Sequence, residues 1–219
     1  ADVVQSGDRN RSEVLQSGFD NSAGDSDAGI AGVDQSGSDN RAFITQAGQL
    51  ASASIDQSGN DNLATINQSV NNAPNPPGSP DPIVTSASID QVGNDNVSTI
   101  NQYSTDPATS SERLMTASSV QNGNGNASLI NQTNSLPGTF ASSGNSALVN
   151  QGGDDNDSVL MQDGVTNTAT VTQNGSGNNS VLDQYGSGNT ATVIQLSAGN
   201  SSNVNQNGSG NSATVTQGN

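Results

Sequence analysis

Apolar and polar residues alternate along short segments of this chain, and each segment ends in a glutamine. The clearest copy runs over residues 167–173 as Asn-x-Ala-x-Val-x-Gln, and residues 189–195 and 211–217 repeat it. A period of two residues places the alanine, the valine and the two amides on one face of a β-strand. We therefore predict short strands in which one face carries small, aliphatic and amide side chains.

The glutamines that end these segments have a fixed spacing. Seventeen of them mark the chain, and twelve of the sixteen intervals between them are eleven residues long. A short fixed period predicts a stack of repeated units, each of which buries its face against the next. The four longer intervals all follow even-numbered glutamines, which are Gln16, Gln68, Gln102 and Gln132. The predicted unit is therefore a pair of strands, about 22 residues long.

The odd-numbered glutamines and the asparagines that follow them five residues later form two regular series. In a stacked repeat, like residues lie about 4.8 Å apart on successive strands. Amide side chains at that spacing can hydrogen-bond along the stack as ladders, which satisfies polar groups inside the core. The predicted core amides are Gln5, Gln35, Gln57, Gln91, Gln121, Gln151, Gln173, Gln195 and Gln217, with Asn10, Asn40, Asn62, Asn96, Asn126, Asn156, Asn178 and Asn200.

These patterns predict an all-β fold, a two-sheet β-solenoid whose coils run strand, turn, strand, turn with cross-β stacking. We expect one such solenoid over residues 1–219, with loop insertions near 22–29, 70–82, 103–115 and 133–143. An alanine four residues before each odd glutamine, Ala31 among them, is expected on the inward face. Ser119 stands where Val or Ile is expected, which predicts a bulge or a register adjustment there.

Composition removes several classes of function. The chain has no His and no Cys, so disulfides and the usual catalytic bases and thiol nucleophiles are excluded, and we expect no enzyme and no cofactor. The net charge of −16 argues against nucleic-acid and anionic-membrane partners. No apolar run is long enough for a membrane-spanning helix, so no membrane insertion is expected.

The repeat resembles that of a known family. Residues 57–68 read Gln-Ser-Gly-Asn-Asp-Asn-Leu-Ala-Thr-Ile-Asn-Gln, and this pattern recurs along nearly the whole chain. It is similar to the curlin repeat of curli, the secreted bacterial amyloid fibres of biofilm matrix. The resemblance implies an extracellular, cell-surface structural subunit that polymerises and mediates adhesion. It also implies two further partners, a curli-type nucleator and a dedicated secretion pore.

Both ends of the predicted stack fit the inward pattern without a cap. Val3 and Gln5 belong to the first segment, and Val215 and Gln217 belong to one of the most regular copies. Unpaired strand edges can template the addition of another chain. The predicted partner is therefore a second copy of the chain, and the predicted function is end-to-end growth of a fibre by strand addition.

Two other interpretations stay open at this stage. Outward threonines on the late odd strands, such as Thr170, Thr192 and Thr214, also fit a soluble surface-binding solenoid of the ice-binding or adhesin type. Asp39, Asp61 and Asp95 share one turn position on successive coils. They are either solvated turn residues or candidate oxygen ligands for calcium, and their stacking is expected to raise their pKa values.

Overall fold

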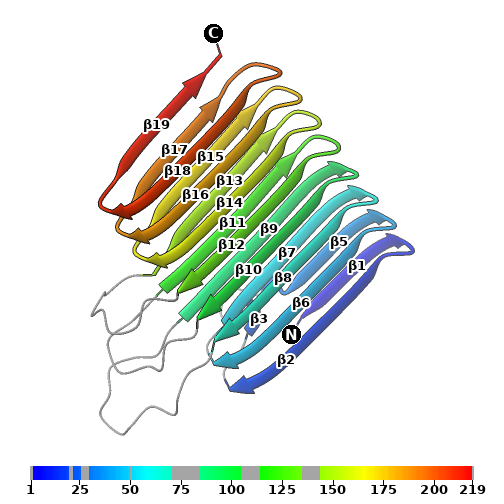
Figure 1. The fold of residues 1–219 in the computed structure, drawn as a ribbon. Coiled ribbons are helices and arrows are strands. Elements are labelled where there is room, and N and C mark those ends of the chain that lie inside the picture. Colours follow the sequence, from blue (N-terminus) through cyan, green and yellow to red (C-terminus); the bar gives the residue numbers. More distant parts are fainter. Residues whose placement is uncertain are drawn as a thin grey trace, which may run out of the picture.

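The computed structural model is an all-β solenoid of two parallel sheets that face one another (Figure 1). It describes residues 2–19, 22–25, 30–49, 51–70, 84–104, 114–134 and 144–218. Successive strands of the chain alternate between the two sheets, so each coil consists of one strand from each sheet. The predicted fold class is confirmed, because period-two strands of nearly constant spacing can bury their selected face only between two such sheets.

The first sheet contains the odd-numbered strands of the chain and, off its main path, the short strand β4 (Ile30–Ala31). Its main path follows the order β1-β5-β7-β9-β11-β13-β15-β17-β19, and all neighbours on it are parallel. The strands are β1 (Val3–Asp8), β5 (Val33–Ser38), β7 (Ala51–Asn60), β9 (Val84–Asn94), β11 (Leu114–Asn122), β13 (Ser146–Gly152), β15 (Thr168–Asn174), β17 (Thr190–Gln195) and β19 (Ser212–Gln217).

The second sheet contains the even-numbered strands in the order β18-β16-β14-β12-β10-β8-β6-β2, again all parallel. They are β2 (Arg11–Phe19), β6 (Arg41–Gln49), β8 (Leu63–Val70), β10 (Val97–Ser104), β12 (Ala127–Asn134), β14 (Asp157–Val165), β16 (Asn179–Ser187) and β18 (Ser201–Ser209).

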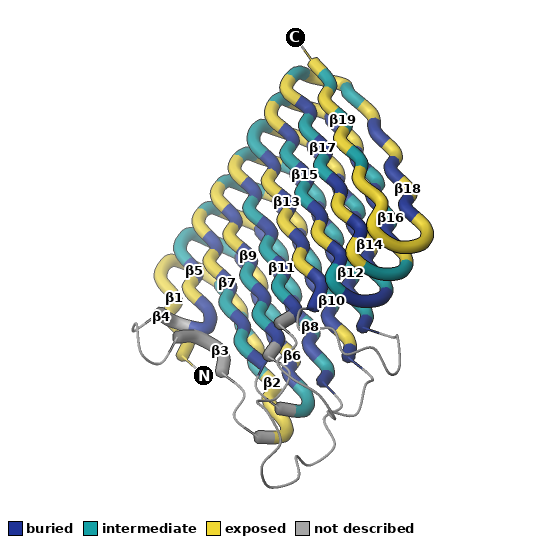
Figure 2. Tube along the Cα trace, turned by 90° about the vertical axis from the view of Figure 1, so that its left-hand side faces the viewer, coloured by how far each residue is buried: buried dark blue, intermediate teal, exposed yellow. Residues whose placement is uncertain are grey.

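The core lies between the sheets and is thin. Along each inner strand, buried and less buried residues alternate (Figure 2). The core cluster consists of alanine and branched aliphatic residues, with Ile44, Ile66 and Ile100 fully buried in the second sheet. Register is in phase throughout, so Ile66 pairs with Ile44 on one side and with Ile100 on the other. Each coil therefore buries its aliphatic residues on those of its neighbours.

Residues 22–25, which were expected within a loop, form a strand instead. β3 (Ser22–Asp25) pairs in parallel with β7, so that Ala23 lies opposite Ala53, and antiparallel with β4 (Ile30–Ala31). The expectation that Ala31 occupies the inward series beside Ala53 is therefore wrong. β5 begins only at Val33, which leaves the first residues of β7 open to pairing with β3.

The remaining loop boundaries differ by a few residues from those expected. Val70 ends β8, residues 103–104 belong to β10, residues 114–115 to β11 and residues 133–134 to β12. The intervening parts of the expected insertions, 26–29, 71–82, 105–113 and 135–143, lie outside the described residues.

The predicted bulge at Ser119 is wrong. β11 runs through this position in unbroken register, with Ser119 opposite Ile89 in β9 and Val149 in β13. The serine side chain is fully buried, and its Oγ has no hydrogen-bond partner. Two intact neighbouring strands hold the backbone in place, so the strand accepts one poorly matched side chain.

Candidate functional site

Two continuous ladders of glutamine side chains run inside the solenoid, one on each sheet. On the first sheet, consecutive core glutamines are joined by Nε2–H···Oε1 hydrogen bonds of 2.5–2.9 Å, from Gln5 to Gln217. On the second sheet, bonds of 2.7–2.9 Å join Gln16 to Gln206 in the same way. The interior members are fully or almost fully buried. The structure therefore brings together the whole predicted glutamine series.

Each interior glutamine also ties the two sheets together. The Nε2 group of Gln121 donates to the carbonyl oxygen of Val97 at 3.0 Å, and that of Gln132 donates to the carbonyl oxygen of Thr116 at 2.9 Å. Both N–H groups of the amide are thus used, one along the stack and one across it. A buried amide left without these partners would cost about 1–3 kcal/mol.

The asparagine series lies at the turn from a first-sheet strand to the next second-sheet strand, which we call the first corner. Asn62 is representative and is almost fully buried. Its backbone N–H donates to Oδ1 of Asn40 at 3.1 Å, and its Nδ2 donates to the carbonyl of Gly93 at 2.8 Å. The same backbone-to-Oδ1 bond recurs from Asn10 to Asn200. The side chain therefore fastens each turn to the turns beside it.

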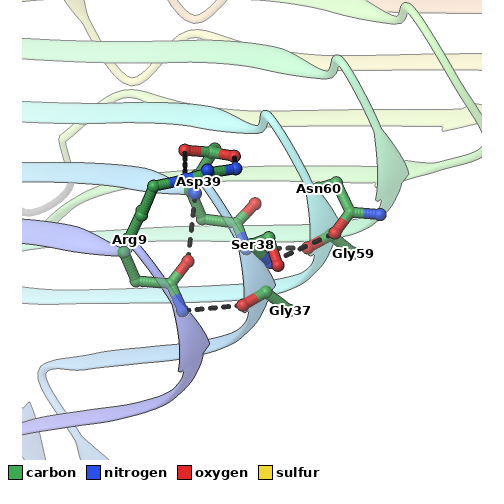
Figure 3. A network of polar contacts seen from close by, with 8 residues as sticks. Arg9, Gly37, Ser38, Asp39, Gly59 and Asn60 are labelled. Carbon is green, nitrogen blue, oxygen red and sulfur yellow. Dashed lines mark hydrogen bonds and ion pairs between the residues drawn. The ribbon is translucent and has the colours of Figure 1, made fainter.

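A second amide series at the first corner was not anticipated. The N–H of Ser38 donates to Oδ1 of Asn60 (Figure 3). Asn60, Asn94 and Asn124 continue this column outward of the core series. The sequence does place asparagine at corresponding positions there, at Asn60, Asn94 and Asn124. Because these side chains lie at the surface, the periodic pattern of inward-facing positions does not include them.

The candidate calcium ligands Asp39, Asp61 and Asp95 occupy a position that requires a left-handed backbone. Their φ angles are 56–59°, and glycine takes the matching place at Gly125 and Gly177 with φ of 65–66°. Aspartate tolerates this conformation better than most residues, which is a structural reason for its presence. The described residues contain no group of three or more carboxylates close enough to share a metal ion. Calcium binding at these residues stays a prediction.

The expected mutual rise in pKa is wrong for Asp39. Arg9 stacks on Asp39 and forms a two-point ion pair, with Nε–Oδ1 at 2.8 Å and Nη2–Oδ2 at 2.5 Å (Figure 3). This hydrogen bond lowers the pKa of the Asp39 carboxyl below its usual value. The charge repulsion that was expected on the turn is found on an outward strand face, where Asp56 lies between Asp34 and Asp90.

The predicted polymer ends lie at opposite ends of the stack (Figure 1). Val3 and Gln5 are exposed on β1, and Val215 and Gln217 are half-buried on β19. Within the described residues, β1 and β2 have neighbours on one side only, and so do β18 and β19. Each end therefore presents two strand edges with the inward amides and valines in register behind them.

The model of the curlin associated repeat matches residues 1–24 and 167–196. These two regions are similar to curlin repeats. No curated protein and no solved structure matches the chain. The matched regions include β1, β2, β15 and β17, and the coils between them share the same in-register columns. The in-register strand pairing of the matched regions thus continues through the coils between them.

Proposed function

We propose that this chain is the structural subunit of a curli-like amyloid fibre and that it grows end to end by β-strand addition. The observation that carries the proposal is the pair of uncovered edges at each end, backed by amide ladders that can continue into a second copy. Curlin repeats support a structural, non-enzymatic subunit in general. In this proposal the fibre forms outside the cell, contributes to biofilm matrix and mediates adhesion.

The proposed partners follow from the same assignment. The main partner is another copy of the chain, and a curli-type nucleator and a secretion pore would serve assembly and export. The described residues contain no helix of the length and apolarity that a membrane crossing requires.

The edge strands give a direct test of strand addition. Val3→Pro and Val215→Pro each remove a backbone donor and restrict the edge strand, so elongation should slow at least tenfold in a Thioflavin assay with electron microscopy. Val3→Ile and Val215→Ile keep the backbone donor and the branched side chain, and they should elongate at the wild-type rate. Growth of the proline variants at the wild-type rate would show that these edges do not pair.

A surface-binding module is the competing function, and the threonine columns are its support. Thr170, Thr192 and Thr214 do stack in register on the outer face of the first sheet. The next residue of that column is Leu148, which is 40% exposed, so the threonine column ends there, and Ser118, Ser88 and Ser54 follow beyond it. A concentration series separates the two functions, because the fibre requires a lag phase and Thioflavin-positive filaments whereas a surface-binding module remains monomeric.

A further inference from the structure

The glutamine ladders give the solenoid a chemical direction. In every Gln–Gln bond along both sheets, Nε2 of the coil nearer the amino terminus donates to Oε1 of the next coil. The ladders on the two facing sheets run the same way. Their donor directions therefore add along the stack instead of cancelling.

Backbone carbonyls of the facing sheet fix this direction. The Nε2 groups of Gln173 and Gln195 point at the carbonyl oxygens of Asp157 and Asn179, at 2.9 and 3.0 Å. Turning either amide over would place Oε1 against a carbonyl oxygen, two acceptors with no proton between them. The buried amides can adopt only one orientation, so the ladder cannot reverse part-way along the stack.

The asparagine column is polar as well. Oδ1 of Asn156 accepts the backbone N–H of Asn178, and Oδ1 of Asn178 accepts that of Asn200, at 3.1 and 2.9 Å. Each asparagine thus offers an acceptor toward the carboxyl-terminal end of the stack, and a backbone N–H on the next coil donates to it. Because a backbone N–H can only donate, this column has a fixed direction too.

The two ends of the described stack consequently present different chemistry. At the carboxyl-terminal end, Gln206 and Gln217 are the last ladder members, and their Nε2 groups are the donors that face onward. At the amino-terminal end, the Nε2 of Gln5 is used on Gln35, which leaves its Oε1 as the acceptor facing away from the stack. One end offers glutamine donors, and the other offers glutamine acceptors.

We propose that these terminal amides select the orientation of an incoming subunit. The carboxyl-terminal face of one copy accepts only the amino-terminal face of another, so the fibre is polar from end to end. Docking two carboxyl-terminal faces would set the Nε2 group of Gln217 against another donor, and docking two amino-terminal faces would set Oε1 of Gln5 against another acceptor. This inference rests on the proposed function, because it states which of the uncovered edges can meet.

Glutamate substitutions at the two ends form a matched test, since each adds one negative charge to a terminal ladder position. Gln217→Glu keeps the acceptor for Gln195, but it replaces the onward donor with an acceptor and also loses the bond to the carbonyl oxygen of Ser201. Gln5→Glu keeps the acceptor that faces the incoming subunit and loses only the bond to Gln35. We expect elongation of Gln217→Glu to slow at least tenfold and that of Gln5→Glu to stay within about threefold of wild type.

Seeded growth with two fluorophores shows the direction itself. Wild-type seeds are capped with one variant in the first step and extended with labelled wild-type protein in the second. A Gln217→Glu cap should leave growth at one seed end only, whereas a Gln5→Glu cap should leave both ends growing. Near pH 3.5 the carboxyl group introduced by Gln217→Glu is largely protonated and gains an O–H donor. The elongation rate of this variant should therefore recover at that pH, relative to wild type at the same pH.

The outcomes separate the two proposals. If wild-type protein forms no fibres, the proposed function fails, and the question of orientation does not arise. If wild-type fibres grow but both glutamate variants slow equally, charge alone is responsible and the directional role of the amides is refuted. Equal growth of both variants at the wild-type rate refutes it as well. Hydrogen exchange of the first coil in Gln5→Glu checks that β1 stays folded. If β1 frays in this variant, the same elongation rates are compared between Gln206→Glu and Gln16→Glu instead.

Discussion

The two corners of each coil perform the same task in different ways. At the first corner, the turn from a first-sheet to a second-sheet strand, an asparagine series runs without a break from Asn10 to Asn200. At the second corner, where the chain returns to the first sheet, the equivalent series found among the described residues runs from Asn145 to Asn211. In the preceding coils its place is taken by Ala51, Thr85 and Met115.

Three of the four insertions leave from the second corner where, among the described residues, this amide series is missing. The positions two residues after Gln68, Gln102 and Gln132 hold Val70, Ser104 and Asn134. Glycine holds this position at Gly18, after which the first insertion leaves, and at Gly48, Gly164, Gly186 and Gly208, after which the chain continues without an insertion. Each core asparagine fastens a turn to both neighbouring turns, so an insertion there would break bonds in two coils at once. At a corner without the asparagine series, the chain can leave the stack at little cost in free energy.

The unsatisfied polar atoms that lie at the corners follow the same division. Thr85 Oγ1, Ser104 Oγ and both amide atoms of Asn134 are buried at the second corner without a hydrogen-bond partner. The first corner has no such atom among its described residues. A continuous amide column thus satisfies its own members, and interrupting it leaves polar groups that no neighbour can reach.

The largest effect on stability is expected from a side chain placed in the first corner. Gly93 has a φ of +120°, and a Cβ there would lie 1.9 Å from the carbonyl oxygen of Gly123. Both partners are backbone, so neither can move without disturbing the column. Gly93→Ala should lower the free energy of unfolding by about 4 kcal/mol or more in urea denaturation of the monomer.

The matched control lies at the second corner. Ser104 follows Gln102 as Gly93 follows Gln91, and it already carries a side chain whose buried Oγ has no partner. Ser104→Ala should leave the free energy of unfolding unchanged or raise it by about 1 kcal/mol. A loss at Ser104 comparable with that at Gly93 would contradict the distinction between the corners.

Substitutions at two asparagines, one at each corner, should change the free energy of unfolding in opposite directions. Asn96 is fully buried and exchanges hydrogen bonds with Asn62, Gly123 and Asn126. Asn96→Ala should therefore cost about 3 kcal/mol of unfolding free energy. Asn134 is equally buried but unpartnered, and Asn134→Leu should gain about 1–2 kcal/mol. Both values come from the same urea series, and destabilisation by Asn134→Leu would show that its amide has a role in the fold.

The sequence allowed the solenoid and its amide ladders to be predicted because each inward column repeats one residue type. The predictions that failed lie at positions where this repeating pattern is interrupted. Ala23 and Ala31 both offer a small residue for the place beside Ala53, and only the late start of β5 decides between them. At Ser119 the local mismatch suggested a bulge, whereas pairing to two intact strands keeps the register.

The direction of the ladders was beyond sequence analysis for a different reason. Which way an amide points depends on carbonyl groups of the facing sheet, such as those of Val97 and Thr116, and not on the identity of the residues. The aspartate positions show the same limit. Spacing placed Asp39 in a column of carboxylates, but the pKa of Asp39 is set by the stacked Arg9.

The smallest predicted effect compares two acidic columns and depends on pH. Asp56 lies between Asp34 and Asp90, with Val4 and Val120 next to them in the column. Partial burial, then the charges of Asp90 and Asp34, raise the pKa of the Asp56 carboxyl. A raised folded-state pKa means that the ionised carboxylate destabilises the fold above that pKa, and that this penalty fades as pH falls toward the unfolded value near 3.8.

At pH 7, Asp56→Asn should therefore raise the free energy of unfolding, measured in urea, by less than about 1 kcal/mol, because solvent screens an exposed group. The difference from wild type should vanish near pH 3. Asp39→Asn should instead lower the free energy of unfolding at pH 7. The pKa of Asp39 is lowered by Arg9, so its contribution is present at pH 7 and is lost as pH falls through the folded-state value. If both variants shift stability in the same direction at pH 7, net charge and not local stacking determines the pH response.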